Sequence, residues 1–472
     1  MDILDGMDAR SSWVNDENVA LLNDLYQFTM LQAYWREGLT GEATFSLFTR
    51  RLPDQRNFLL ACGLADVLEY LEKLRFSSQS IEFLGSLKLF DARFLEWLAE
   101  LRFTGNVYAV PEGTPVFTGE PLLEVAAPLP EAQVVETFVM NQVHLQTVLA
   151  SKAARVVLAA RGRKVVDFGV RRMHGADAGI KAARAFYIAG VDATSNVLAG
   201  QLYGIPVAGT VAHSYIQAHD DELDAFRAFA ELYPDTILLV DTYDTLEGVR
   251  KVVALAEELG SAFRVTGIRL DSGDLAALAL EARAILDAAR LAQVDIFASG
   301  GLDEHAIADI VDRDAPILGF GVGTSMGVAS DAPALDVAYK LTGYSGRGRV
   351  KLSTGKPILP GLKQIYRQEE RSIAVRDVLA QAGEVHPGRP LLVEVMKNGV
   401  RQPAGVVDLD EARARAREEI HRLPERVRRI DPADPPYPVE ISAGLQRAHE
   451  KAIREVEPSP ARGRRSAPTQ ST

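Results

Sequence analysis

The sequence is poor in cysteine and has no long apolar run, and each absence excludes a class of protein. The 472 residues contain one cysteine, Cys62, so an internal disulfide and a cysteine-based zinc site are both excluded. No stretch reaches the roughly 18 uninterrupted apolar residues that a membrane-spanning helix needs. The N-terminus, MDILD, is acidic where a secretory signal is basic and then apolar. We therefore expect a cytoplasmic protein in which Cys62 packs as a small hydrophobic residue.

Basic charge is also scarce. Lys and Arg total 52 against 64 Asp and Glu, which gives a formal net charge of −12. A general attraction to nucleic acid or to an anionic membrane is therefore not expected, and an anionic ligand needs a local basic pocket. The composition, with 47% hydrophobic and 25% charged residues, is typical of a globular enzyme. At about 100 to 200 residues per domain, the length predicts two or three domains.

Short β-branched runs alternate with longer helical patterns between residues 165 and 324. The strand-like runs are VVDFGV, VDATSN, PVAGT, TILLVDTYD, VTGIRLDSGD, VDIFASGG and ILGFGVGT. Apolar strands that alternate with amphipathic helices predict a parallel sheet covered by helices. Seven such units fit an α/β barrel better than an open sheet.

The flanking regions have other patterns. Asn18 is a candidate cap for a helix from Val19 to Trp35, and residues 106–128 contain short strands separated by Gly and Pro turns. These strands predict an antiparallel accessory domain, and a helical pattern over residues 131–160 leads into the barrel. After Gly343 the alternation stops, and a basic, strand-prone segment predicts another domain or a lid. A charged helix is expected at residues 411–421, and residues 457–472 have the composition of a disordered tail.

Polar residues end every predicted strand of the barrel, which is where barrels of this kind place their active sites. They are Asp167, Arg171 and Arg172; Ser195 and Asn196; Thr210, His213 and Ser214; Asp241 and Thr242; Arg269, Asp271, Ser272 and Asp274; Ser299, Gly300 and Gly301; and Gly321, Gly323 and Thr324. One such group is typical of any turn. Seven groups in phase predict a binding site.

The last two loops, SGGLDE and GFGVGT, are glycine-rich turns where barrels often bind phosphate through backbone amides and a helix N-terminus. Tight turns alone are the alternative interpretation. Neither loop matches a P-loop or a dinucleotide-binding motif.

Arg171 and Arg172 follow the first strand, where a guanidinium can bind a carboxylate or a phosphate at two points. A surface salt bridge is the alternative for this pair.

Asp241 and Asp271 end successive strands, and such carboxylates can together hold Mg²⁺ against the phosphates of a substrate. Capping of the following helices is the alternative interpretation for both.

His213, in GTVAHS, is a candidate general acid, metal ligand or nucleophile, or else a structural histidine. No HExxH motif accompanies it, so a zinc site is not predicted. No lysine ends a barrel strand, which argues against a Schiff-base aldolase.

Taken together, these motifs resemble the nicotinate phosphoribosyltransferase family. The resemblance extends over NDLYQFTM, FGVRR, ATSN, GTVAHS, VDTYD, RLDSGD, SGGLDE, GFGVGT and PGLKQIYR, in this order from residue 23 to residue 367. Several long motifs in one order are far more specific than any of them alone.

The resemblance implies an incomplete seven-stranded α/β barrel of the type II phosphoribosyltransferase kind, with an accessory α+β domain built from N- and C-terminal segments. The expected division is residues 1–142, accessory; 143–345, barrel; 346–442, a C-terminal segment that packs with the accessory domain; and 443–472, a helix end and a tail. The family implies a homodimer with shared active sites, in which Tyr26 stacks on the pyridine ring of the partner's substrate. A core tyrosine is the alternative.

The implied reaction is the first step of NAD salvage from nicotinic acid. The ring nitrogen of nicotinate attacks the anomeric carbon of phosphoribosyl diphosphate, and diphosphate leaves. Mg²⁺ near Asp241 and Asp271, with Arg269, stabilises the charge that develops.

The same resemblance implies roles for the remaining residues. Substrate contacts are implied for Thr210, Ser214 and Ser272, and either Arg171 or Arg172 reads the nicotinate carboxylate. The two glycine-rich loops hold the ribose phosphate, and ATP phosphorylates His213. The alternatives are a nicotinamide or quinolinate phosphoribosyltransferase and a non-catalytic nucleotide-binding barrel.

Overall fold

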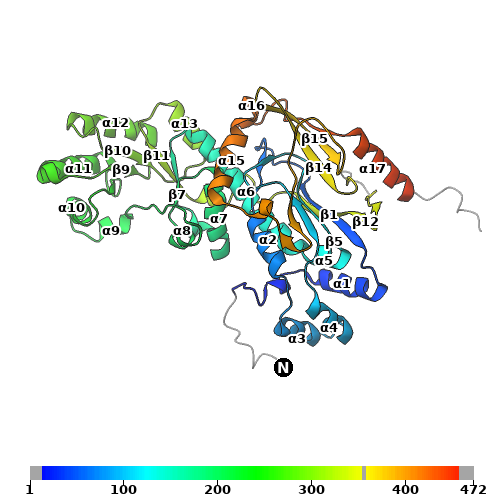
Figure 1. Ribbon diagram of the computed structural model, residues 1–472. Helices are drawn as coiled ribbons and strands as arrows, with labels where there is room; N and C mark the ends of the chain where they lie inside the picture. Colours follow the sequence, from blue (N-terminus) through cyan, green and yellow to red (C-terminus); the bar gives the residue numbers. More distant parts are fainter. Residues whose placement is uncertain (1–12, 353–357, 457–472) are drawn as a thin grey trace, which may run out of the picture.

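The computed structural model describes residues 13–352 and 358–456. Figure 1 shows an elongated molecule, with a parallel sheet and its helices at one end and antiparallel sheets at the other. Between the two ends lie helices α6 (Glu136–Ala160), α7 (Ala176–Ala189) and α15 (Leu409–His421). Among the described residues, no helix is long and apolar enough to cross a membrane.

The parallel sheet has six strands. Their order is β7 (Ala193–Thr194), β6 (Lys164–Asp167), β11 (Gly319–Val322), β10 (Asp295–Ala298), β9 (Gly267–Leu270) and β8 (Ile237–Leu239). Every neighbouring pair in this sheet is parallel. Because the last strand, β11, pairs with the first, β6, the sheet curls into an α/β barrel, as the strand pattern predicts, and it is incomplete, as the family resemblance implies.

The structure differs from the prediction at the third strand, PVAGT. This segment makes a single parallel bridge, between Val207 and Thr194, and is not a full strand. Pro206 has no N–H to give to a ladder, and the segment has a neighbour on one side only, because β8 is the opposite edge of the sheet. The barrel is therefore open between Val207 and β8.

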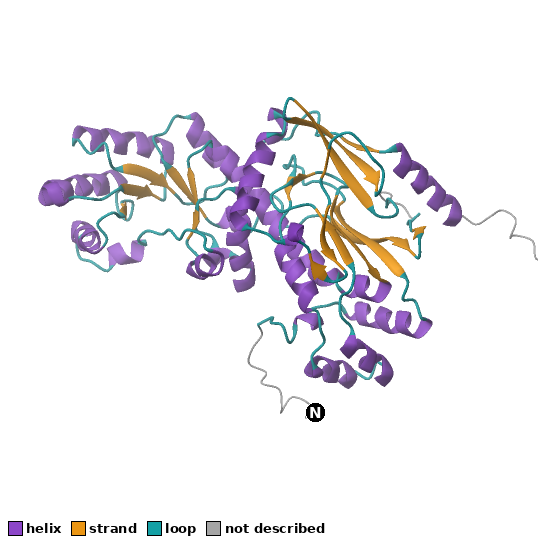
Figure 2. Cartoon of the chain, viewed as in Figure 1, coloured by secondary structure: helices purple, strands orange, loops and turns teal. Residues whose placement is uncertain are grey.

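Helices surround the parallel strands, whereas the antiparallel strands gather at the other end of the molecule (Figure 2). The elements around the barrel are η2 (Val170–Arg172), α7 (Ala176–Ala189), α8 (Val197–Tyr203), α9 (His213–Gln217), α10 (Glu222–Leu232), α11 (Thr245–Leu259), η3 (Gly260–Ala262), α12 (Leu275–Ala288), α13 (Glu304–Asp312) and α14 (Thr324–Gly327). Fully buried residues such as Leu238, Ile268 and Ala298 form the strand side of its core.

A seven-stranded antiparallel sheet forms the accessory part. Its order is β13 (Arg347–Gly348), β12 (Val337–Tyr344), β1 (Glu42–Thr49), β5 (Pro121–Pro128), β3 (Asn106–Ala109), β17 (Val393–Lys397) and β18 (Val400–Arg401). Because β17 pairs with β3, the N- and C-terminal segments share one sheet. The boundary predicted at residue 345 assigns β12 to the barrel, but this strand pairs with β1, and Tyr339 stacks on Phe45 with ring centroids 4.8 Å apart.

Two smaller sheets and the remaining helices complete this part. The sheets are β16 (Arg389–Pro390), β14 (Lys363–Glu370), β15 (Ile373–Gln381) and β19 (Val439–Ile441), and β2 (Leu59–Leu60) with β4 (Pro115–Val116). The helices are η1 (Val19–Leu21), α1 (Leu25–Glu37), α2 (Leu64–Lys73), α3 (Ser78–Ser86), α4 (Ala92–Glu100), α5 (Leu129–Val134), α6 (Glu136–Ala160), η4 (Pro403–Gly405), α15 (Leu409–His421), α16 (Glu425–Arg428) and α17 (Ala443–Val456).

The N-terminal helix starts later than predicted. Asn18 caps no helix, because its side chain binds the backbone of Asn15 and Trp13 instead. The chain leaves the short η1 turn at Leu22, and the Asn23 amide binds the carbonyl of Val134 at 3.0 Å before α1 begins. The charged helix predicted at residues 411–421 is confirmed as α15. The predicted tail, residues 457–472, lies outside the described residues.

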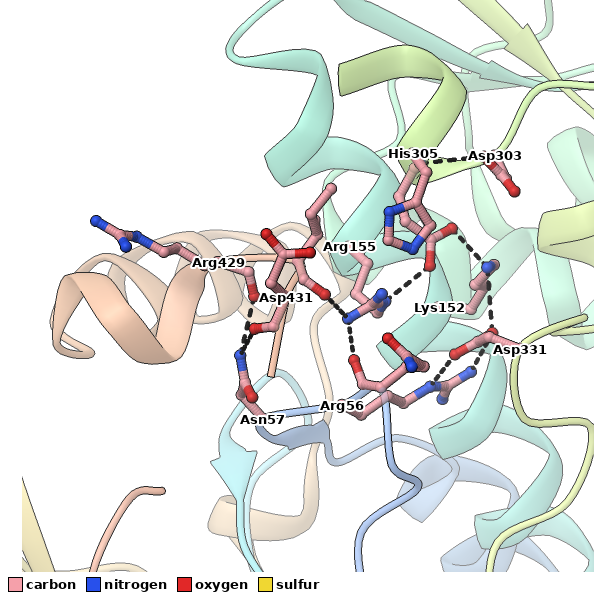
Figure 3. A network of polar contacts seen from close by, with 12 residues as sticks. Arg56, Asn57, Lys152, Arg155, Asp303, His305, Asp331, Arg429 and Asp431 are labelled. Atoms are coloured by element: carbon pink, nitrogen blue, oxygen red, sulfur yellow. Dashed lines mark hydrogen bonds and ion pairs between the residues drawn. The ribbon is translucent and has the colours of Figure 1, made fainter. Parts of the chain in front are cut away.

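A buried ion network joins the accessory part to the barrel (Figure 3). Lys152 on α6 contacts Glu304 on α13 at 2.5 Å and Asp331 at 3.1 Å. Arg155, one turn further along α6, contacts Glu304 at 2.8 Å, and Arg56 contacts Asp331 at 2.8 Å. Because each carboxylate faces two cations, α6 holds Glu304, the last residue of SGGLDE and the first of α13, in one position.

Candidate active site

A cavity of about 360 Å³ opens at the carboxyl ends of β6, β9, β10 and β11. It is lined by Phe168, Arg171, Arg172, Asp271, Ser299, Gly300, Gly301, Leu302, Gly321, Gly323, Thr324, Ser325 and Ser330. The structure therefore brings together both predicted glycine loops, both predicted arginines and one of the two predicted carboxylates.

At two positions of this cavity only glycine fits, because another part of the chain lies too close for a side chain. Gly300 has φ +89°, and a Cβ placed on it would lie 1.7 Å from the carbonyl oxygen of Asp271. A Cβ on Gly321 would lie 2.3 Å from the Phe168 ring. Thr324 starts α14 at the end of β11, where the first N–H groups of a helix have no partner within the helix. Both loops line the cavity, where backbone N–H groups can meet an anion.

Asp241 is held by the strand end next to it. Its Oδ2 accepts hydrogen bonds from the backbone N–H of Asp271 at 2.9 Å and from the Ser272 hydroxyl at 2.6 Å. Its Oδ1 is buried and has no hydrogen-bond partner in the part of the chain that the structure describes. A buried carboxylate oxygen without a donor is costly unless a ligand or a cation faces it.

Neither Asp241 nor Asp271 caps a helix. Helix α11 is capped by Asp244 and α12 by Asp274, whose side chains accept from backbone N–H groups of the first turn. Asp271 accepts a hydrogen bond from the Ser299 hydroxyl instead, and so joins β9 to the loop after β10. The capping interpretation of this carboxylate pair is therefore wrong.

Asp241 and Asp271 fit a divalent cation only in part. Over residues 13–352 and 358–456, no three His, Cys, Asp or Glu side chains are grouped closely enough to hold a metal ion. A Mg²⁺ ion here must therefore take most of its oxygen ligands from substrate and water, as Mg²⁺ commonly does. The unpartnered Oδ1 of Asp241 fits that requirement.

Arg269 lies behind these carboxylates. Its guanidinium donates to the Thr210 hydroxyl and to the carbonyl of Val211, and it lies 5.9 Å from the centre of the Phe168 ring. Burial lowers the pKa of Arg269, and the Asp271 and Asp241 carboxylates oppose that shift. Since an arginine remains charged at any physiological pH, a fixed cation faces the predicted metal site.

His213 is the first residue of α9 and bridges two predicted site residues. Its Nδ1 lies 3.2 Å from the Thr242 hydroxyl, and its Nε2 lies 3.8 Å from Oδ2 of Asp271. The imidazole is 40% exposed, so it is not a packed core histidine. The adjacent Ser214 is exposed on the same short helix.

Arg171 and Arg172 are exposed in η2, at the mouth of the cavity. Arg171 donates one hydrogen bond, at 3.3 Å, to the carbonyl of Phe168. Neither arginine forms an ion pair with any residue that the structure describes, so the surface salt-bridge interpretation is wrong. Two cations without partners at a cavity mouth are suited to an anionic ligand.

Four other strand-end residues bind other parts of the chain or are buried within it. Asp167 is buried, its pKa is raised by that burial, and it binds the N–H of Gly169 and the Thr194 hydroxyl. Asn196 caps α8, and Asp274 caps α12 while pairing with Arg313 at 2.9 Å. The Ser195 hydroxyl is buried without a partner among the described residues.

Comparison with known proteins identifies the family. Residues 21–144 match the model of the nicotinate phosphoribosyltransferase N-terminal domain, and residues 163–378 match the nicotinate phosphoribosyltransferase family model. A nicotinate phosphoribosyltransferase of Mycobacterium tuberculosis, pncB2, is 55% identical over 423 residues, which cover 90% of this chain and 91% of that protein. The chain belongs to the nicotinate phosphoribosyltransferase family.

More distant proteins match as well. The Bacillus subtilis nicotinate phosphoribosyltransferase is 42% identical over 75% of this chain and 74% of its own. The crystal structure of human nicotinic acid phosphoribosyltransferase superposes with a TM-score of 0.81 at 31% identity, covering 91% of this chain and 99% of the human one. A nicotinate-nucleotide pyrophosphorylase from Pyrococcus furiosus has a TM-score of 0.70 at 26% identity and covers 88% of this chain and 98% of its own.

Tyr26, to which the family resemblance assigns a substrate contact, does not line the cavity of its own chain. It lies on α1, at the end of the molecule that holds the antiparallel sheet (Figure 1). Its side chain is 46% exposed, so the core interpretation is wrong. Partial burial and the nearby Glu136 carboxylate raise the pKa of Tyr26 to about 12.

Some lining residues were missed by sequence reasoning. Phe168 forms one wall of the cavity, and its place in the motif FGVRR, between a strand end and two arginines, could have identified it. Ser325 follows the predicted Thr324 directly, and its hydroxyl donates to the carbonyl of Leu302. Ser330 carries no sequence signal, because it reaches the cavity only through the fold of the segment after α14.

Proposed function

We propose that the protein transfers the phosphoribosyl group of phosphoribosyl diphosphate to the ring nitrogen of nicotinate, giving nicotinate mononucleotide and diphosphate in NAD salvage. The observation that carries this proposal is the cavity in which two unpaired arginines, an aspartate and two glycine-rich loops meet. Family membership supplies the reaction class, and the charges around the cavity fit two anionic substrates.

The ribose phosphate of phosphoribosyl diphosphate fits the loop side of the cavity. Gly300, Gly301, Gly321 and Gly323 let the backbone approach an anion closely, and the start of α14 adds N–H donors. At the mouth of the same cavity, Arg171 or Arg172 binds the carboxylate of nicotinate. A guanidinium gains a charge-assisted hydrogen bond from the acid that it cannot gain from the amide.

The leaving diphosphate fits the end of the cavity at Asp271. Asp241 and Asp271 would hold Mg²⁺, which when bound stabilises the negative charge on the leaving group. Ser272 and the backbone of Asp271 orient Asp241, and Thr210 orients the guanidinium of Arg269. These residues are therefore in place before the charge develops, which is the condition for effective electrostatic stabilisation.

We assign the coupling to ATP to His213. The Thr242 hydroxyl holds Nδ1, which leaves Nε2, beside Asp271, as the nucleophile. The lone pair of Nε2 attacks the γ-phosphorus of ATP, the bond to the bridging oxygen breaks, and ADP leaves with its electron pair. Ser214 borders this position. The phosphate is later discharged to water, which regenerates the imidazole.

We further propose a homodimer in which Tyr26 of each subunit completes the other subunit's site. Apolar side chains are exposed on two separate faces. One face, around α1, carries Leu22, Leu25 and Tyr26, which are 40%, 50% and 46% exposed, and the other carries Val197, Leu198, Leu202 and Val207, on and beside α8 at the open edge of the barrel. Exposed apolar side chains that cluster in this way are typical of protein contacts.

Product analysis tests the proposed function. The protein is incubated with phosphoribosyl diphosphate, Mg²⁺ and ATP, and nicotinate, nicotinamide and quinolinate are offered separately. We expect the mononucleotide of nicotinate to form fastest. Preferred use of nicotinamide or quinolinate would establish one of the alternative transferases, and no product with any of the three would establish a non-catalytic nucleotide-binding barrel.

A further inference from the structure

A second cavity, of about 370 Å³, lies on the outer side of the barrel, where α6, α7, α15 and α16 meet. Its floor is apolar and includes Val157, Leu158 and Ile420. It also touches Ala189 and Gly190, at the C-terminal end of α7, whereas Arg171 and Arg172 precede the N-terminal end. Since 14 helical residues span about 20 Å, this cavity is separate from the candidate active site.

The rim of this cavity is cationic in a protein whose net charge is −12. Arg417 is exposed and makes no hydrogen bond or ion pair with any residue the structure describes. Arg428 donates one long hydrogen bond, 3.5 Å, to Nδ1 of His421, and its buried Nε–H has no described partner. Two guanidinium groups on one rim thus have unused donors.

The other charged groups of the rim are already engaged. Arg413 donates to the carbonyls of Tyr187 at 2.8 Å and Gly190 at 3.0 Å, and it stacks on the Tyr187 ring at 4.5 Å. The acidic lining residue, Asp410, accepts a hydrogen bond from the Tyr187 hydroxyl at 2.7 Å. Arg413 therefore binds the carbonyl groups at the C-terminal end of α7, and the N–H donors of Arg417 and Arg428 remain for a ligand.

An adjacent cavity of about 770 Å³ shares Arg428 but has a different charge balance. Its other arginines are neutralised, since Arg161 pairs with Asp312 at 2.6 Å and Arg429 pairs with Glu425 at 2.9 Å. That larger cavity has no excess of cationic donors for an anion. The contrast places the unpaired positive charge on the α6–α7–α15 cavity.

We propose that the α6–α7–α15 cavity binds a phosphorylated small molecule of mononucleotide size. Its phosphate contacts Arg417 and Arg428, which offer several N–H donors in the planar arrangement that suits phosphate oxygens. Its base or other apolar part lies against Val157, Leu158 and Ile420. The volume is within the range of about 300 to 1,000 Å³ that is usual for small-molecule sites.

The cavity also touches two elements that lead to the candidate active site. Helix α7 runs from the cavity to η2. The floor helix α6 carries Lys152 and Arg155, which bind Glu304, the last residue of SGGLDE (Figure 3). Its position is therefore that of an effector site. The binding proposal itself does not depend on the proposed function.

Calorimetric titration of the full chain with AMP, and with adenosine as the ligand that lacks phosphate, tests the proposal. We expect saturable AMP binding that is weakened about ten-fold or more in R417Q/R428Q and in A414W, whose indole would fill the cavity mouth, and adenosine binding that is weaker to a similar degree. Arg447→Gln removes an exposed arginine of α17 and is the matched control; it should leave binding unchanged.

A double variant of the candidate active site, R171Q/R172Q, separates the two cavities, since it should retain AMP binding. Two results would overturn the proposal. One is AMP affinity that is unchanged in both R417Q/R428Q and A414W. The other is no saturable binding of AMP or inorganic diphosphate up to about 10 mM. Circular dichroism confirms that each variant is folded.

Discussion

At the scale of single residues, the role of each strand-end carboxylate follows from what its oxygens accept. Asp244 and Asp274 accept from the N–H groups of helices, whereas Asp241 and Asp271 bind the neighbouring strand ends. Four aspartates of similar sequence context thus fall into two classes. The second class has oxygens left for a ligand.

Asp271→Asn tests this division. The amide oxygen can still accept from Ser299, so we expect normal folding and thermal stability close to that of the native chain. The loss of charge at the diphosphate end should lower kcat by on the order of 10² to 10³. Steady-state rates across a Mg²⁺ titration check this expectation, and native-like rates throughout would reduce Asp271 to a structural hydrogen-bond acceptor.

His213 distinguishes a transferase coupled to ATP from an uncoupled one. Incubation with ATP labelled at the γ-phosphate should give an acid-labile, base-stable label that the other substrates discharge. His213→Ala should lose the label and the ATP stimulation but retain slow transfer, because Arg269 and the phosphate loops act without the imidazole. Native-like labelling of His213→Ala would defeat the assignment, as would a native protein that takes up no label.

The proposed function assigns the choice between nicotinate and nicotinamide to Arg171 or Arg172. Loss of a charge-assisted contact should reduce the preference for the acid by about 1.5 to 3 kcal/mol, roughly 10- to 100-fold in the ratio of kcat/KM values. Arg171→Ala and Arg172→Ala, each measured with both substrates, show which arginine is responsible. If the ratio is unchanged in both variants, the carboxylate is read elsewhere.

At the scale of elements, the buried network of α6 and α13 holds the end of the glycine-rich loop after β10 in place. Glu304 faces Lys152 and Arg155, and although burial opposes its ionisation, these cations lower its pKa below the usual value. The pKa of Asp331 is also lowered, since Arg56 and Lys152 outweigh its burial. Both depressed values mean that the stabilisation is present above the unfolded-state pKa values near 4 and is lost as pH falls.

Glu304→Gln should lower the free energy of unfolding by about 3 to 5 kcal/mol at pH 7, because it leaves two buried cations with one fewer countercharge. Urea denaturation from pH 7 to about pH 3 checks this, and the loss of stability below about pH 4 should be smaller in the variant than in the native chain. Glu258→Gln removes half of an exposed pair with Arg227 and should leave the free energy of unfolding nearly unchanged. Equal effects of the two substitutions would contradict the role of the buried network.

At the scale of the whole molecule, Tyr26 and the cavity lie at different ends of one chain (Figure 1). The proposed homodimer brings them together, and mixing two inactive variants tests it. If Tyr26→Ala and Asp271→Asn subunits exchange at random, half of the dimers are mixed and each carries one intact site. The mixture should therefore recover about one quarter of the native activity.

Light scattering gives the oligomeric state of each sample in that experiment. A mixture no more active than the mean of its two components, in samples that are dimeric and exchange subunits, would show that Tyr26 does not complete a partner's site. Leu198→Asp, on the exposed α8 face, should weaken the dimer and lower the activity together.

Local pattern was enough to predict the architecture and most of the cavity. The period of apolar residues alternates between strand and helix over residues 165–324, and parallel strands bring their carboxyl ends to one edge. For this reason Asp271, Ser299 and Gly321, far apart in the chain, could be expected at one site. The glycine-rich motifs could be expected to form tight loops because only glycine tolerates the close approach found at Gly300.

Tertiary structure decided which of these polar residues serve the site and which serve the fold. Asp241 and Asp274 look alike in sequence. In the structure Asp241 accepts a hydrogen bond from the end of the neighbouring strand, whereas Asp274 caps a helix. PVAGT has the pattern of a strand, but an edge position with one neighbour leaves it a single bridge at Val207. Strand β12 follows the barrel in sequence but pairs with β1, because long-range pairing depends on which edges the completed core leaves free.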